Sequence, residues 1–150
     1  MTALRQAELR RRVVAEAHTW ARTPYHHHAR IKGVGVDCAQ ILAAVFEAAG
    51  VVPHLELGNY APQWHLHQGE EVYLRWLHDV GAVRLAPGLH PQAGDVGVWR
   101  FGRTFSHGAI VVEGGVDPLL LHAYIGRGVI VTRASEDPLA GREHCYWSAI

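Results

Sequence analysis

Cys38 is a thiol placed where a helix is expected to begin. It follows Asp37 in the segment G-V-G-V-D-C-A-Q-I-L-A-A-V-F, in which a glycine-broken approach gives way to helix-forming residues. Aligned backbone N–H groups at the start of a helix favour the thiolate form of a cysteine. The position therefore predicts a nucleophilic thiol at Cys38.

A thiol nucleophile needs a base, and two later segments each offer an imidazole. His107 opens the alternating run S-H-G-A-I-V-V-E-G-G, and His122 lies in L-L-L-H-A-Y-I-G-R-G. Alternate side chains of a strand share a face. Two neighbouring antiparallel strands would therefore bring His107 to the thiol and His122 to the back of His107. This is the arrangement of nucleophile, base and orienting residue that covalent catalysis uses.

The elements that must position these residues predict an α+β fold. Apolar spacing predicts helices over Thr2–Trp20, Cys38–Ala49 and Gly69–Val80, with an irregular segment over Val51–Gln63. Strands are expected over Val96–Phe101, His107–Glu113, Leu119–Tyr124 and Gly128–Arg133. Because the helices come first and the strands later, we expect the nucleophile helix to pack across one face of a small antiparallel sheet.

Length and composition narrow the class of protein. At 150 residues we expect one domain, residues 1–150. No apolar stretch approaches the roughly 20 residues that span a bilayer, and the charged N-terminal segment lacks the apolar region of a secretory signal. We therefore expect no membrane insertion. The formal charge is zero and the arginines are dispersed, so we expect no nucleic-acid partner either. The 2 cysteines suit a reducing cytoplasm at synthesis.

Several motifs in order, T-P-Y, G-V-D-C, A-G-D-V-G-V-W, S-H-G-A-I-V-V-E-G-G and L-L-H-A-Y, resemble those of the NlpC-type, papain-like cysteine peptidases. More narrowly, the chain resembles the phage-tail and gene-transfer-agent branch of that family, over roughly Ala15 to Arg133. The resemblance implies a papain-like fold in which Cys38 is the nucleophile, His107 the general base and His122 the residue that orients His107.

The same resemblance places two further residues near the chemistry. Tyr25 matches a tyrosine whose hydroxyl lies near the oxyanion site, and Asp37 matches the aspartate that precedes the nucleophile. The chain departs from the family by having Ala39 and Gln40 in place of the usual serine and glycine, and His26-His27-His28 in place of Trp-Gly-Gly. We expect these departures to line the entrance and to affect substrate preference.

The implied function is that of a cell-wall endopeptidase. By the same resemblance, it would hydrolyse an amide of a peptidoglycan stem peptide through a thioester, at the bond between D-glutamate and a diamino acid. The enzyme would be cytoplasmic at synthesis and then carried on a phage or phage-like tail tip, where tail hub proteins are its expected partners. Two alternatives remain open: a structural hub-binding module that docks through Gly58–Leu74, and a thiol acyltransferase.

Each candidate also has an ordinary structural explanation. Asp37 suits a helix cap, Tyr25 could be a wedge beside Pro24, and Cys145 is assigned to packing. The histidines at 26–28, 65 and 67 raise the possibility of a metal site. No carboxylate or cysteine lies at a recognised ligand spacing from them, so we expect no metal and no cofactor.

Overall fold

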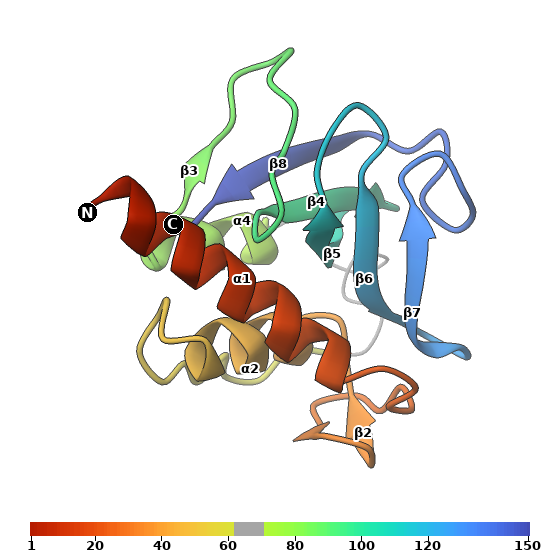
Figure 1. The fold of residues 1–150 in the computed structure, drawn as a ribbon. Coiled ribbons are helices and arrows are strands. Elements are labelled where there is room, and N and C mark those ends of the chain that lie inside the picture. The colour runs from red at the N-terminus through yellow and green to blue at the C-terminus, as the bar shows by residue number, and fades with distance from the viewer. Residues whose placement is uncertain (62–70) are drawn as a thin grey trace.

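The chain forms a mixed structure of helices and an antiparallel sheet, which is the predicted α+β class (Figure 1). The computed structural model describes residues 1–61 and 71–150. Its helices are α1 (Ala3–Thr19), α2 (Gln40–Ala48) and α4 (Val72–Asp79). A 2-stranded sheet pairs β1 (Arg30–Ile31) with β2 (Gly35–Val36).

The main sheet has 6 strands in the order β3-β8-β4-β5-β6-β7, and every neighbouring pair is antiparallel. The strands are β3 (Val83–Arg84), β4 (Val96–Phe101), β5 (Thr104–Glu113), β6 (Leu119–Tyr124), β7 (Gly128–Arg133) and β8 (His144–Ser148). The predicted bounds of β4, β6 and β7 are confirmed, and β5 begins earlier than predicted. The meander from β4 to β7 carries both imidazoles on neighbouring strands.

The sequence analysis did not predict β3 or β8. Strand β8 has no alternation of buried and exposed residues. It takes its place by pairing with β4 on one side, where Cys145 lies opposite Val98, and with β3 on the other. Local sequence does not mark a strand whose position is set by its partners.

The sheet is covered on both faces, and the two faces carry different residues. One face meets the helices in a cluster that includes Val13, Ala17, Ile41, Val45, Val98, Ile110, Val112 and Leu121. The other face carries a smaller cluster of Trp99, Ala109, Val111 and Leu120 with Leu139. Since side chains alternate along a strand, His107 and His122 belong to the second face, with Ala109 and Leu120.

Helix α1 follows its predicted bounds closely. The hydroxyl of Thr2 accepts a hydrogen bond from the backbone N–H of Arg5 at 3.1 Å, which caps the first turn. Leu9, Val13 and Ala17 are buried as the spacing predicts. Leu4 also lies near helical spacing from these residues, but it is 84% exposed and belongs to the turn before the first buried residue, Leu9.

An ion pair joins α1 to the sheet. Arg10 donates to the Oδ1 atom of Asp95 at 2.7 Å and to the carbonyl oxygen of Ala93 at 2.9 Å. Its other terminal nitrogen donates to Ser148 at the end of β8. Asp95 is buried, and its Oδ2 atom accepts from the backbone N–H of Gln92. The motif aspartate of A-G-D-V therefore positions α1 against β4 and β8.

Among the helices of residues 1–61 and 71–150, none has the length and apolar character needed to cross a bilayer.

Replacing Asp95 by alanine should destabilise the fold strongly, because the substitution leaves the partly buried guanidinium of Arg10 without its buried partner. Breaking a pair of this kind lowers the free energy of unfolding by roughly 3–5 kcal/mol. Urea unfolding followed by circular dichroism measures the change. The control is Glu8→Ala, which removes a solvent-exposed carboxylate paired with Arg5 and Arg12 and should have a much smaller effect. Equal effects of the two variants would contradict the anchoring role of Asp95.

Candidate active site

Asp37 holds the turn that leads into α2. Its Oδ1 atom accepts hydrogen bonds from the backbone N–H groups of Ala39 at 3.1 Å and Gln40 at 2.8 Å, and its carbonyl oxygen accepts from Ile41. The first helical hydrogen bond therefore starts at Asp37, although regular α2 begins at Gln40 and not at the predicted Cys38. Asp37 acts as the helix cap that the sequence suggested.

The other carboxylate oxygen of Asp37 holds two segments that lie on either side of it. Oδ2 accepts from the backbone N–H of His28 at 2.9 Å and from the hydroxyl of Tyr60 at 2.5 Å. Asp37 is 1% exposed, so these bonds form away from water. One buried carboxylate thus fixes the histidine-rich loop, the residues after α2 and the turn that carries Cys38.

The histidines of this loop serve the same assembly. The Nε2 atoms of His27 and His28 lie 3.0 and 2.7 Å from the carbonyl oxygen of Tyr60, and the His28 ring stacks on the Tyr60 ring at a centroid distance of 4.0 Å. Gln40 is buried and accepts from Arg30. Of the residues expected to line an entrance, His27, His28 and Gln40 are therefore engaged in internal contacts, whereas His26 is exposed and Ala39 lines a neighbouring pocket.

The thiol of Cys38 lies against the backbone of β5. Its sulfur is 3.6 Å from the carbonyl oxygen of Ser106, to which the S–H donates. The backbone N–H of Gly108 also lies near the sulfur and favours the thiolate. Ser106 and Gly108 flank His107 in the chain, so the sulfur lies beside the two peptide groups that join His107 to β5.

Burial raises the pKa of the Cys38 thiol well above its usual value, and the negative charge of Asp37 raises it further. The backbone N–H groups of Gly108 and Cys38 act in the opposite direction and are outweighed. This direction differs from the one expected for a thiol at a helix start. Regular α2 begins two residues later, and the charge of Asp37 that acts on the sulfur is negative. The resting thiol is neutral, so its nucleophilic form requires a base.

The two imidazoles lie in direct contact. The Nε2 atom of His107 is 2.9 Å from the Nδ1 atom of His122, and the Nε2 atom of His122 is 2.9 Å from the hydroxyl oxygen of Thr132 on β7. Both histidines are buried, as is Thr132. Phe101 and Tyr124 pack around the His107 ring at centroid distances of 5.2 and 5.7 Å. The structure thus joins His107 and His122, as the strand pattern predicted.

Burial lowers the pKa of His122 to about 4, and the positive charge of Arg127 adds to the effect. His122 is therefore neutral at neutral pH. A neutral imidazole has one donor nitrogen and one acceptor nitrogen, so it can accept from His107 while donating to Thr132.

Tyr25 reaches the site from the loop before β1. Its backbone forms an isolated bridge with Val36, next to Asp37. Burial raises the pKa of the Tyr25 hydroxyl well above its usual value, and the charges of Cys38 and Asp37 raise it further. The hydroxyl therefore stays protonated and is available as a hydrogen-bond donor near Cys38.

Tyr73 is a residue of this site that the sequence analysis assigned to a docking surface. It is 2% exposed, and its hydroxyl donates to the carbonyl oxygen of Cys38 at 3.1 Å. A Cβ atom on Gly108 would overlap this hydroxyl, so Gly108 makes room for Tyr73. In the sequence, the signal for this close approach is the small residue Gly108, which directly follows His107. Of the other residues proposed for that docking surface, Glu71 accepts from the backbone N–H of Phe105 at 3.0 Å, and Trp64, His65, His67 and Glu70 lie outside the described residues.

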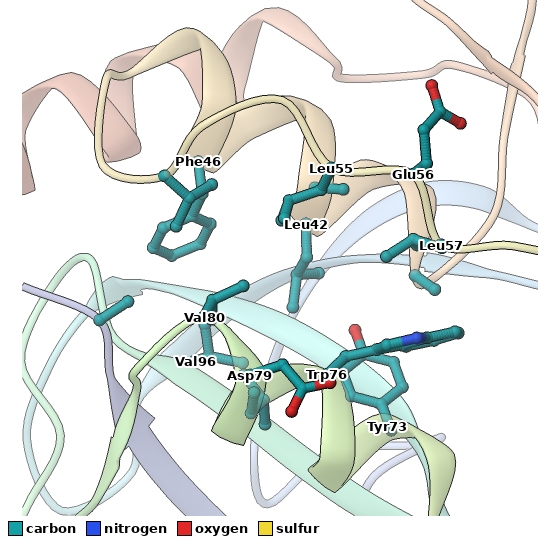
Figure 2. A pocket seen from close by; sticks show the side chains of 15 residues that line it. Leu42, Phe46, Leu55, Glu56, Leu57, Tyr73, Trp76, Asp79, Val80 and Val96 are labelled. Carbon is teal, nitrogen blue, oxygen red and sulfur yellow. The ribbon is translucent and has the colours of Figure 1, made fainter.

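A pocket of about 190 Å³ lies next to the site, between α2 and α4 (Figure 2). Its walls are mostly carbon and include Leu42, Phe46, Leu55, Leu57, Trp76 and Val80. Glu56 and Asp79 also line it, and the carboxylate of Glu56 points away from the leucine side chains (Figure 2). Two lining residues connect the pocket to Cys38. Ala39 follows Cys38 in the chain, and the hydroxyl of Tyr73 donates to the carbonyl oxygen of Cys38. Cys38, His107 and His122 are not among its lining residues. The pocket therefore lies beside the candidate site and does not contain these three side chains.

Within residues 1–61 and 71–150, no three histidine, cysteine, aspartate or glutamate side chains gather in a way that would hold a metal ion. His65 and His67, which the metal hypothesis included, lie outside those ranges.

Gly108→Ala should displace Tyr73 and lower the free energy of unfolding by about 1–3 kcal/mol, because the added methyl group overlaps the tyrosine hydroxyl. In a Tyr73→Ala background the same substitution should have little further effect. Urea unfolding of both single variants and the double variant measures this coupling. Strictly additive losses would contradict the close approach of Tyr73 to Gly108.

The stability of the protein should fall as the pH drops from about 6.5 to about 4, in part because of His122. Its pKa is lowered in the folded state from 6.5 to about 4, so the unfolded chain binds the proton more readily in this range. The contribution of His122 is present above pH 6.5 and is lost toward pH 4, by on the order of 3 kcal/mol.

The measurement compares urea unfolding at several pH values for the wild type and for His122→Gln, so that the effects of the other histidines cancel. The variant should lose stability less steeply on acidification. Parallel curves for the two proteins would contradict the neutral, buried state of His122.

Comparison of the chain with protein-family models and with curated proteins found no match. The function of this site therefore has to follow from its geometry and from the motifs of the sequence.

Proposed function

We propose that this chain is a papain-like cysteine peptidase that hydrolyses an amide bond through Cys38, His107 and His122. The observation that carries the proposal is the position of the Cys38 sulfur, 3.6 Å from the carbonyl oxygen of Ser106, the residue before His107 on β5, together with the 2.9 Å contact between the rings of His107 and His122. A thiol, an imidazole and a group that fixes this imidazole are the parts that nucleophilic acyl transfer needs.

The reaction would begin with a turn of the Cys38 side chain. In the resting structure the S–H donates to the Ser106 carbonyl, and rotation would direct it to the second ring nitrogen of His107. As the sulfur attacks the substrate carbonyl, His107 takes the thiol proton. It then gives this proton to the departing amine, leaving an acyl group on the sulfur as a thioester. A water molecule that loses a proton to His107 attacks the thioester and releases the acyl group as a carboxylic acid, and His107 returns that proton to the departing sulfur.

The raised pKa of the thiol supports this sequence of events. A preformed thiolate is disfavoured by burial and by Asp37, so proton transfer to His107 accompanies the attack. The developing negative charge on the substrate oxygen would be met by the backbone N–H of Cys38 and by the Tyr25 hydroxyl. Loss of one donor of this kind typically lowers the rate about 100- to 1,000-fold.

The proposed substrate is a stem peptide of peptidoglycan, and the proposed setting is a phage-like tail tip. Both rest on the motifs that resemble NlpC-type peptidases. Asp95 and Gly108, which belong to those motifs, have structural roles here: Asp95 anchors α1 and Gly108 admits Tyr73. These roles account for two motif positions that do not take part in the chemistry.

A thiol acyltransferase is the second candidate, and the carbon-lined pocket beside Cys38 is the observation that favours it. An apolar pocket of about 190 Å³ offers room for a short apolar acyl group. In that case an amine, and not water, would receive the acyl group from the thioester.

The test is digestion of defined muropeptides by the wild type and by Cys38→Ala, with the fragments identified by mass. The wild type should release two fragments whose summed mass exceeds that of the substrate by one water. Cys38→Ala should release none while keeping its circular dichroism spectrum.

His107→Ala should be as inactive as Cys38→Ala, and His122→Gln should retain more activity, because His122 acts on His107 and not on the substrate. Cleavage by Cys38→Ala would remove the nucleophile assignment. Transfer of the acyl group to an added amine would favour the acyltransferase.

A further inference from the structure

Thr132 extends the chain of hydrogen bonds that begins at His107. Its hydroxyl oxygen lies 2.9 Å from the Nε2 atom of His122, while the Nδ1 atom of His122 lies 2.9 Å from the Nε2 atom of His107. Three buried side chains on β5, β6 and β7 thus form one connected line across the sheet face that looks away from the helices. The proton positions within this line are interdependent.

Each contact in the line needs one donor and one acceptor, so neutral imidazoles allow two arrangements. In the first, His107 carries its proton on Nε2 and donates to Nδ1 of His122, which in turn donates from Nε2 to Thr132. In the second, Thr132 donates to His122, His122 donates from Nδ1 to His107, and the proton of His107 sits on Nδ1.

Only the first arrangement leaves the Nδ1 atom of His107 able to accept a proton from the thiol. It is also the only arrangement that fits a protonated His107, which must donate from Nε2. For His122 to accept at Nδ1, its own proton must lie on Nε2, where Thr132 is the observed partner. The hydroxyl of Thr132 therefore bears on which nitrogen of His107 is basic.

We infer that Thr132 is a positioning residue that holds His122 in the Nε2–H tautomer and thereby keeps His107 competent as the base toward Cys38. This inference rests on the proposed function. Thr132 touches neither the thiol nor the substrate, and it acts through His122. The buried, neutral state of His122 supports it, because a charged His122 would donate from both nitrogens and could not accept from His107.

Two measurements test the inference. Both use protein that carries Cys145→Ser, so that Cys38 is the one remaining cysteine of the sequence. They compare this protein, called wild type here, with its Thr132→Val and Thr132→Ser variants. The first is the tautomer of His122, read from nitrogen chemical shifts of protein labelled with ¹⁵N-histidine. The wild type and Thr132→Ser should show His122 with its proton on Nε2. Thr132→Val, which keeps the shape but lacks the hydroxyl, should shift His122 toward the Nδ1–H tautomer.

The second measurement is the rate at which iodoacetamide alkylates Cys38, followed by intact mass at neutral pH. Loss of one hydrogen bond of ordinary strength should slow alkylation by about fivefold in Thr132→Val, and Thr132→Ser should restore the rate. In the muropeptide assay the same variant should lower kcat and leave KM unchanged. Circular dichroism of each variant shows that the fold is retained.

A wild-type His122 with its proton on Nδ1 would overturn the inference, even if Thr132→Val does not fold. An unchanged tautomer and rate in a folded Thr132→Val would overturn it as well. If the wild type cleaves no amide bond but the tautomer and alkylation results hold, the proposed peptidase function fails and the role of Thr132 stands. If cleavage occurs without these effects, the role of Thr132 fails alone.

Discussion

The carboxylate of Asp37 is the constraint on which the rest of the site depends. It is buried, and its two oxygens accept hydrogen bonds from three different parts of the chain: the start of α2, the loop of His28 and the side chain of Tyr60. A buried carboxylate is tolerated only when its oxygens are satisfied, so these segments have to meet at this point. The position of Cys38, one residue later, follows from that requirement.

The same carboxylate makes the thiol less acidic. Burial and the charge of Asp37 both disfavour a negative sulfur, which leaves Cys38 neutral at rest. The carboxylate of Asp37, which fixes the turn that carries Cys38, thus also disfavours a preformed thiolate at Cys38. The arrangement suits a reaction in which the base acts at the moment of attack, and it makes the proton position on His107 important.

The imidazoles that we propose as base and orienting residue are carried by the sheet. Its helix-facing residues form the larger part of the core, whereas His107, His122 and Thr132 lie on the other face with Ala109, Leu120 and Leu139. The thiol comes to β5 from the helix and meets the backbone at Ser106 and Gly108. Tyr73 fills the space beside Gly108 and donates to the carbonyl of Cys38, so α4 also helps to hold Cys38 in place.

Local sequence determined a large part of this molecule. Alternation and turn residues predicted β4, β6 and β7, and helical spacing predicted α1, because these signals depend on short-range geometry. Spacing and residue type also indicated Cys38, His107 and His122 as a group. Tertiary structure alone decided the pairing of β8 with β3 and β4, the contacts of Asp95, Tyr73 and Thr132, and the direction in which the thiol pKa moves. These depend on burial and on contacts between residues far apart in the chain, which no local pattern contains.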